Sequence, residues 1–440
     1  MARDVQGLEL TAASASAAAA YDAAVAAYCG LRRDAGDHLK QIFAADPDMA
    51  MGHVLRGYFM QLFATRKASE RAAQSLAAAE RAAANPREAA HRAALAAWVA
   101  GDVSGAVERW ETILGEHPRD LLALKLAHYG SFYLGDAAAM LRQSGAALRH
   151  WGESVPGYGY LLGCHAFALE ETGDYRAAER AGRRAVALEP GDIWAAHAVT
   201  HVCEMEDRAE DGLAWIAAAE GNWRAANNFA FHVFWHRCLF LLALGRQSEA
   251  LARYDREVRA ESTDDYLDIT NAVALLWRFE QAGLDVGGRW AELAARAADH
   301  LDDHALVFAD LHYLMALAAA GDEARIAHWL ERSRAHAARS ADTAGEVLAE
   351  IGLALGEAAL AHRRGDWTRV VELMLPRRAA IRRIGGSHAQ RDLFEQMLID
   401  AASRQFPTVA RSLIAARLET RPRNSWARLH VSAGADGPAG

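Results

Sequence analysis

The chain has 440 residues, a net charge of −9 and a composition that is 52% apolar and 24% charged. One compact core rarely supports so many residues, so the chain forms either several domains or one elongated repeat array. Charges of both signs are interspersed, without the basic stripe that binds nucleic acid or the basic arm that binds a membrane surface. We therefore expect neither a nucleic-acid partner nor a membrane partner.

The local sequence predicts helices throughout. Strong helix formers dominate, Pro occurs only 9 times, and runs of alternating β-branched residues are absent. The beginning of the chain does not have the pattern of a secretory signal, and the four cysteines lie in helical patterns without CxxC spacing. We therefore expect an all-α cytoplasmic protein with reduced, buried thiols.

A repeated helical hairpin organises the sequence. Its clearest copy spans residues 160–190, where an apolar helix ends at Gly173-Asp174 and a second amphipathic helix follows. One such hairpin cannot bury its own apolar face, so neighbouring hairpins must stack. The turns recur at a spacing typical of tetratricopeptide-like repeats, at Gly101, Gly135, Gly173, Asp207, Gly245, Gly283, Gly321 and Gly365.

The repeats predict a right-handed superhelix of tandem helix hairpins, with a concave groove. We expect residues 1–85 to form N-terminal helices of degenerate repeats and residues 86–425 to form the repeat array with a central polar cavity. Residues 426–440, which end in GADGPAG, are expected to be a disordered tail.

The middle repeats place polar side chains on the groove-facing side of their first helices. When each turn residue is set as position 15, positions 2, 5, 9 and 12 share one helical face. Two other groups, Asp310 and His312, fall beside that face in a later repeat. The expected groove residues of the two central repeats are Trp194, His197, His201, Glu204, His232, Trp235 and His236.

The same segments contain two HxxxH pairs, His197/His201 and His232/His236. Four converging imidazoles suit zinc or another divalent transition metal, although no motif requires a cofactor. A polar ligand site without metal and a purely structural role remain as alternatives, and neither segment is an HExxH protease motif. If these histidines face the groove, alanine at His201 or His236 should cost about 1 kcal/mol or less.

A second polar segment, GGSHAQRD, spans residues 385–392. Ser387 and Gln390 have the spacing of a capping box, which predicts a helix start. This spacing does not account for His388, Arg391 and Asp392 together, and a helix N-terminus beside His and Arg suits an anion. We expect this segment to reach the same cavity.

Several of these motifs resemble the tetratricopeptide repeat protein 38 family over about residues 8–425. The similar segments include HAVTHVCEM, NNFAFHVFWHRCLFLLALGR, LDITNAVALLWRFEQAGLDVGGRW and GGSHAQRD. The resemblance implies a repeat superhelix and a soluble intracellular protein, and it lends no catalytic residues because the family has no assigned reaction. It adds Asp268 and Arg278 to the site residues proposed above, and it makes Trp277 a further motif position.

Two functions compete on this evidence. The first is a binding protein whose cavity takes a small polar ligand or a peptide segment. The second is an enzyme that acts on a small molecule in the same cavity by acid–base or metal-assisted chemistry. A phosphate loop, a dinucleotide-binding glycine pattern and a GxSxG elbow are all absent from the sequence, which weakens the second hypothesis.

Overall fold

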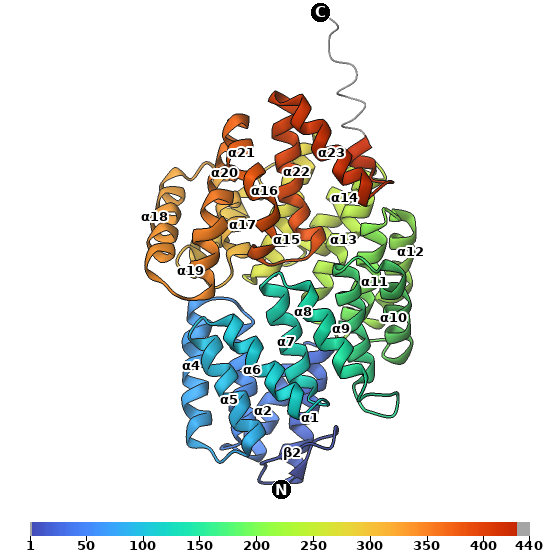
Figure 1. Cartoon of the computed structure of the whole chain (residues 1–440), viewed down its shortest axis with the longest axis vertical. Coiled ribbons are helices and arrows are strands. Elements are labelled where there is room, and N and C mark those ends of the chain that lie inside the picture. The colour runs from blue at the N-terminus through green and yellow to red at the C-terminus, as the bar shows by residue number, and fades with distance from the viewer. Residues whose placement is uncertain (1, 429–440) are drawn as a thin grey trace, which may run out of the picture. The chain divides into compact units, whose positions relative to one another are not determined.

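The computed structural model describes residues 2–428 and confirms the all-α prediction (Figure 1). The strands in this part of the chain are the short antiparallel pair β1 (Ala2–Arg3) and β2 (Glu9–Leu10). No helix among residues 2–428 combines the length and the apolar character needed to cross a membrane. Residues 425–428 are helical, and the rest of the predicted tail, 429–440, lies outside the described residues.

The chain divides into two compact units. Among the described residues, the first comprises 2–199, 218–230 and 341–344, and the second comprises 200–217, 231–340 and 345–428. Four helices contain a boundary between the units and so contribute residues to both: α11 (Ile193–Met205), α12 (Ala209–Ala219), α13 (Phe229–Ala243) and α19 (Thr343–Val347).

The first unit is built from consecutive helix hairpins, because α1 packs on α2, α3 on α4, α5 on α6, α7 on α8 and α9 on α10. Its other helical element is the short η1 (Glu220–Asn222). The helices are α1 (Ala15–Cys29), α2 (Ala35–Ala45), α3 (Ala50–Gln61), α4 (Arg66–Arg81), α5 (Pro86–Val99), α6 (Val103–Glu116), α7 (Leu121–Tyr133), α8 (Ala137–Leu148), α9 (Tyr158–Glu171) and α10 (Tyr175–Leu188).

The second unit continues the pattern, with α15 packed on α16, α17 on α18, α20 on α21 and α22 on α23. Its helices are α14 (Gln247–Arg253), α15 (Tyr266–Gln281), α16 (Arg289–Ala297), α17 (Val307–Ala320), α18 (Glu323–Arg339), α20 (Leu353–Arg363), α21 (Trp367–Met374), α22 (His388–Gln405) and α23 (Pro407–Thr420). Shorter or irregular turns are η2 (Tyr254–Val258), η3 (Ala298–His300), η4 (Leu348–Gly352) and η5 (Leu375–Ile384).

The predicted turns have a common physical basis. All eight turn residues adopt a positive φ, between 55° and 87°, which glycine reaches without steric cost and which Asp207 adopts where glycine is absent. The aspartate that follows the glycine then caps the next helix, as Asp174 does by accepting a hydrogen bond from the Ala177 N–H. The Gly-Asp pair therefore ends one helix and starts the next.

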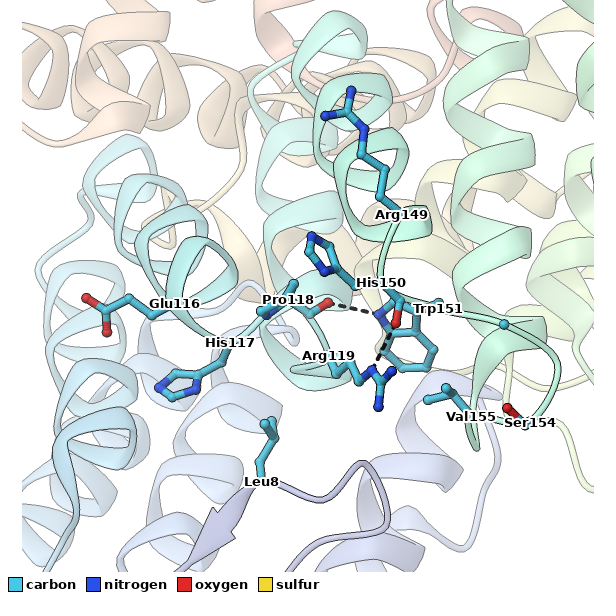
Figure 2. Close-up of a pocket in the computed structure, with 11 residues that line it drawn as sticks. Leu8, Glu116, His117, Pro118, Arg119, Arg149, His150, Trp151, Ser154 and Val155 are labelled. Atoms are coloured by element: carbon cyan, nitrogen blue, oxygen red, sulfur yellow. Dashed lines mark hydrogen bonds between the residues drawn. The ribbon is translucent and has the colours of Figure 1, made fainter.

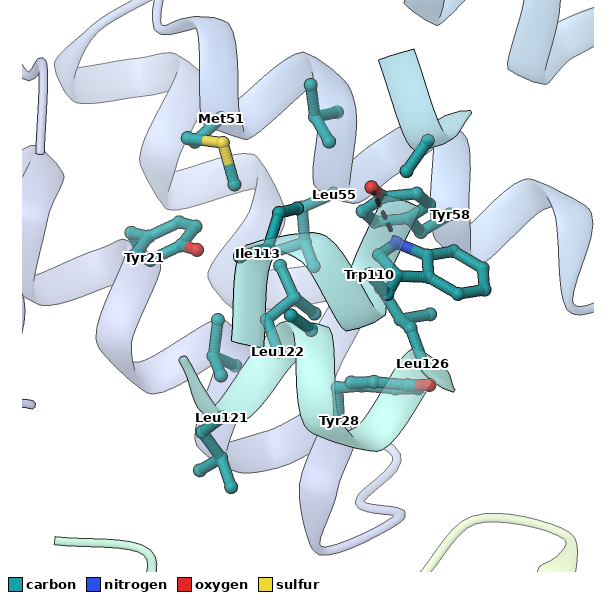
Figure 3. Close-up of a cluster of buried hydrophobic side chains, with 14 of the residues drawn as sticks. Tyr21, Tyr28, Met51, Leu55, Tyr58, Trp110, Ile113, Leu121, Leu122 and Leu126 are labelled. Carbon is teal, nitrogen blue, oxygen red and sulfur yellow. Dashed lines mark hydrogen bonds between the residues drawn. The ribbon is translucent and has the colours of Figure 1, made fainter. Parts of the chain in front are cut away.

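The core of the first unit shows how neighbouring hairpins are joined (Figure 3). Trp110 and Tyr58 are fully buried, and the Trp110 indole N–H donates to the Tyr58 hydroxyl over 3.1 Å. Tyr58 in turn donates to the carbonyl of His91, also buried, over 2.8 Å. Two neighbouring hairpins, α3/α4 and α5/α6, are thus joined by hydrogen bonds between buried polar groups inside one apolar cluster.

Candidate metal and polar-ligand site

Four histidines on α11 and α13 form the most chemically capable cluster among the described residues. One ring nitrogen from each of His197, His201, His232 and His236 lies within 4.8 Å of those of the other three. The i,i+4 spacing puts each pair on one face of its own helix. His201, His232 and His236 belong to the second unit, and His197 lies one turn before His201 on the continuous helix α11.

The rings pack closely against each other and against one tryptophan. The His201 and His236 ring centroids are 4.5 Å apart, and those of His232 and His236 are 5.1 Å apart. The Trp235 indole stacks on His232 at 5.3 Å and meets His236 edge-on at 4.7 Å. The convergence of the two HxxxH pairs, expected from the repeat register, is therefore found.

Asn271 on α15 orients one of these imidazoles. Its Oδ1 lies 3.0 Å from His232 Nδ1, and because an amide oxygen only accepts, Nδ1 carries the proton. The Nε2 atom of neutral His232 then keeps its lone pair. A hydrogen bond from the second ring nitrogen is the usual way in which a metal-ligating histidine is held in the correct tautomer.

Burial keeps the imidazoles of His232 and His236 neutral. It lowers the pKa of His232 to about 3, with a smaller lowering from His201 and an opposing contribution from Asn271. Burial also lowers the pKa of His236 well below its usual range, and the neighbouring His201, His232 and Arg278 add to that shift. Neutral imidazoles are the form that donates a lone pair to a metal.

The predicted exposure of these residues in a groove is wrong. His201 and His236 are 0% exposed, and His197, His232 and Trp194 are 2% exposed. The reason is aromatic packing.

Within the first unit, His197 stacks on Phe167 at 5.5 Å and meets Phe229 edge-on at 5.0 Å. Trp194 packs on Phe167 at 4.8 Å, and its ring also receives the Lys125 ammonium at 4.6 Å. These side chains therefore contact many core atoms. The small stability cost expected for alanine at His201 or His236 stays a prediction, and the full burial of both rings favours a larger cost.

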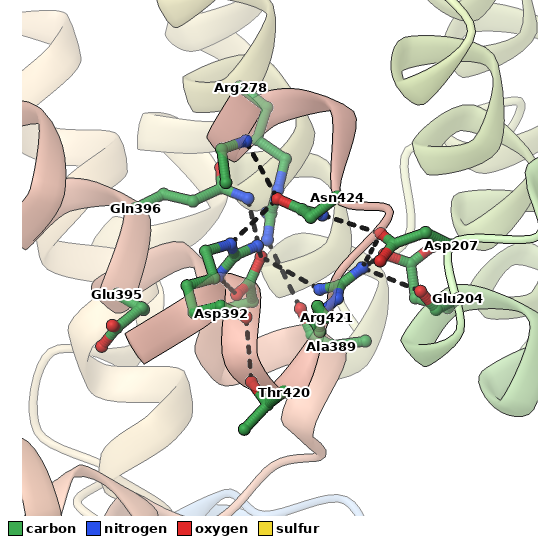
Figure 4. Close-up of polar contacts among 12 residues, drawn as sticks. Glu204, Asp207, Arg278, Ala389, Asp392, Glu395, Gln396, Thr420, Arg421 and Asn424 are labelled. Atoms are coloured by element: carbon green, nitrogen blue, oxygen red, sulfur yellow. Dashed lines mark hydrogen bonds and ion pairs between the residues drawn. The ribbon is translucent and has the colours of Figure 1, made fainter. Parts of the chain in front are cut away.

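Glu204 and Asp392 belong to a buried ion-pair network in the second unit (Figure 4). Asp392 accepts two hydrogen bonds from Arg417, one of them over 2.9 Å. Arg421 donates to the Glu204 carbonyl and to the Asp207 carboxylate, both over 2.8 Å. Burial alone would raise the pKa of Asp392, but Arg417 and Arg421 hold it well below its usual value.

The rest of the GGSHAQRD segment divides between a helix cap and the surface. Ser387 Oγ accepts from the Gln390 N–H over 3.2 Å, and Gln390 Oε1 accepts from the Ser387 N–H over 2.9 Å, which confirms the capping box. His388 is exposed and therefore does not join the buried histidine cluster. Arg391 is half-buried and donates to the Gly386 carbonyl, so the predicted anion site at this helix start stays a prediction.

The remaining predicted residues lie in separate surroundings of the second unit. Asp268 accepts a hydrogen bond from Thr263, and Asp310 lies 3.4 Å from His304 Nδ1. The His312 Nδ1–H donates to the Phe308 carbonyl over 2.7 Å, and burial lowers the pKa of His312 to about 4. These contacts give each of the two carboxylates, and one ring nitrogen of His312, a polar partner.

Sequence reasoning missed Asn271, Arg417 and Arg421. Asn271 carried a usable signal, since it is a single amide in the otherwise apolar run TNAVALL. Arg421 had none, because its partner Asp207 is 214 residues away in the sequence.

A cavity elsewhere contains none of the predicted residues. In the first unit, a hollow of about 640 Å³ is lined by Glu116, His117, Arg119, His150 and Trp151, among others (Figure 2). The Trp151 indole donates to the Pro118 carbonyl over 2.9 Å, and Arg119 donates to the His150 carbonyl over 2.9 Å. These polar groups fix the loop, and the hollow is open to solvent.

Comparison with known proteins leaves the family open. No family model matches the chain. Among solved structures, the chain is similar to one described as Naa15/Naa10 bound to HypK-THB, at 12% identity and a TM-score of 0.26. The match covers 95% of this chain and 65% of that chain, so this chain spans slightly less than two thirds of it. A likeness of this size carries no argument, and the hairpin fold described above stands on its own turns and packing.

Proposed function

We propose that this protein is a helical-repeat protein that binds one divalent transition metal ion through His197, His201, His232 and His236. The observation that carries the proposal is the convergence of four buried ring nitrogens within 4.8 Å of one another.

Four converging imidazoles could form a tetrahedral site if their ring nitrogens moved closer together. With Zn–N bonds of about 2.0–2.1 Å, tetrahedral ligand atoms lie about 3.3 Å apart. The four ring nitrogens lie within 4.8 Å of one another, so the side chains would close around a bound ion to reach that spacing. An all-imidazole set suits zinc, copper or nickel rather than magnesium or calcium, which prefer oxygen.

Four protein ligands fill a tetrahedral shell. A catalytic zinc site usually keeps one position for water or substrate, whereas a structural site is closed. The arrangement therefore favours metal binding that stabilises the helices over metal-assisted catalysis, and it favours the binding protein over the enzyme.

Metal analysis of protein purified without a His-tag tests the proposal. After dialysis against zinc and then against metal-free buffer, we expect about one ion per chain for the wild type. His236→Gln removes one ligand and should abolish or strongly weaken retention. The control is His128→Gln, which replaces a histidine that is also buried but is not among the four.

Wild-type protein that retains no metal would refute the proposal. Equal zinc retention by the wild type and His236→Gln, with both proteins shown to be folded by circular dichroism, would also refute it.

A further inference from the structure

An aromatic pocket lies in the second unit, where residues of α15, α16, α17, α20, α21 and α22 meet around a space of about 220 Å³. Its largest walls are three indoles and two thioethers, from Trp277, Trp290, Trp367, Met315 and Met397. Indole rings offer wide apolar faces, and methionine sulfur makes favourable contacts with aromatic rings. The pocket is therefore lined by side chains suited to an apolar ligand.

Small side chains leave this space open. Ala318 and Ala319 on α17 and Ala359 on α20 also line the pocket. Helix interfaces are close-packed, and voids larger than a water molecule are few. An apolar cavity of about 150 Å³ takes benzene, whereas sites for drug-sized ligands have roughly 300–1,000 Å³. The volume of this pocket therefore suits a ligand of one or two rings.

Polar and aromatic contacts hold the indoles in place. The Trp290 Nε1–H donates to Glu280 Oε1 over 2.8 Å. The buried His362 ring contacts the other two indoles, with centroid distances of 5.5 Å to Trp277 and 5.2 Å to Trp367. Walls that are fixed before binding lower the cost of ordering on association.

The charged groups at the pocket are paired with one another. Arg363 Nη1 lies 2.5 Å from Glu280 Oε2, and Arg404 Nη2 lies 3.2 Å from Asp400 Oδ1. Asp400 also accepts a hydrogen bond from the His362 Nε2–H over 2.9 Å. Since each guanidinium already has a carboxylate, the pocket does not need a charged ligand for balance.

The arginines also disfavour a cation in the pocket. Arg363 lines it, and the Arg404 guanidinium already lies over the Trp367 ring at 4.5 Å. A cationic ligand would compete with that guanidinium for the ring. A neutral aromatic ring can instead pack on the indoles by offset stacking or edge-to-face contact.

We infer that this pocket binds a small uncharged molecule built on one or two aromatic rings. The inference is independent of the proposed function, because none of the four clustered histidines is among the lining residues. A more open hollow of about 410 Å³ adjoins the pocket through the shared residues Trp290, Ala319 and Arg363, so a ligand can enter from that side.

Isothermal titration calorimetry with 2-naphthol tests the inference, with decahydro-2-naphthol and tetramethylammonium as saturated and cationic comparisons. We expect the wild type to bind 2-naphthol at least about tenfold more tightly than either comparison molecule. Ala318→Phe places a ring in the pocket and should weaken that binding at least about tenfold. The control is Ala324→Phe, because Ala324 is exposed on α18 and does not line the pocket.

NMR of protein that carries ¹⁵N-labelled tryptophan locates the bound molecule. The chain has 12 tryptophans, and the variants Trp290→Phe and Trp367→Leu assign two of the indole N–H signals. In the wild type, 2-naphthol should shift both signals, and in Ala318→Phe it should shift neither. The unaffected signals report whether Ala318→Phe is folded. If it is not, Trp367→Leu takes its place, since it removes one half-buried wall and should also weaken binding.

Wild-type protein that does not bind 2-naphthol overturns the inference. Binding that shifts neither assigned signal, or that Ala318→Phe and Trp367→Leu both leave unchanged, places the ligand elsewhere and also overturns it. Equally tight binding of the saturated alcohol or of tetramethylammonium would contradict the preference for an uncharged aromatic ring.

Discussion

Replacing Asp392 with asparagine removes one charge from the buried network without changing the shape of the side chain. In the wild type, Asp392 accepts two hydrogen bonds from Arg417 and one over 2.7 Å from Gln396, and Arg421 lies 3.9 Å away. The side chains of Arg417, Arg421 and Asp392 are 5%, 8% and 13% exposed. Asp392→Asn therefore leaves Arg417 with no opposing charge in a site that water reaches poorly.

Breaking a buried ion pair by removing one partner costs about 3–5 kcal/mol. Since Asp392 is slightly exposed and Asn keeps part of the hydrogen bonding, we expect a loss near the lower end, about 3 kcal/mol. Glu249→Gln is the matched control, because Glu249 pairs with Arg246 on the surface, where such pairs contribute at most about 1 kcal/mol. The double variant Asp392→Asn/Arg417→Met should recover part of the loss, because it removes the uncompensated charge as well.

Urea unfolding followed by tryptophan fluorescence measures these free energies. The network account would be refuted if Asp392→Asn unfolded at the same urea concentration as Glu249→Gln. It would also fail if Arg417→Met added its full single-variant cost in the double variant.

Three further predictions concern the histidine cluster and the repeat packing. His236→Ala should cost roughly 2 kcal/mol or more, because the ring is fully buried; calorimetric melting that matches wild type would contradict this. Because the folded-state pKa of His232 lies near 3 and the usual value is 6.5, its contribution to stability is complete above about pH 6.5 and is lost as pH falls toward 3. The free energy of unfolding of the metal-free protein should thus fall by up to about 1.4 kcal/mol per pH unit because of this residue. In His232→Gln, the urea midpoint should fall less steeply between pH 7 and 5 than in the wild type. Ala166→Leu should cost roughly 1–3 kcal/mol by overpacking, since Ala166 is fully buried where a Cβ on Gly182 would lie 3.5 Å away; an unchanged melting temperature would refute the assigned packing.

The repeat pattern predicted the hairpins because its signals are local. A glycine with positive φ and the aspartate that caps the next helix are adjacent in the sequence, as at Gly173-Asp174, so the pair is recognisable from the sequence alone. The same register aligned the two HxxxH pairs, and their convergence followed from the regularity of the helices.

The environment of the site depends on residues far away in the sequence. The aromatic side chains of Phe167 and Phe229, from other elements, bury His197, and no pattern around His197 reports them. The ion-pair network is equally non-local, because Arg421 meets Asp207 from 214 positions away in the sequence.

The most direct test of the metal proposal is X-ray absorption at the zinc edge, on zinc-loaded protein without a His-tag. Four imidazoles predict a first shell of about four nitrogen scatterers at about 2.0–2.1 Å, together with the outer-shell scattering of the rings. His236→Gln should lose this signature. A shell of oxygen atoms without ring scattering, or a sulfur shell near about 2.3 Å, would show that the zinc is bound elsewhere and would contradict the four-histidine site.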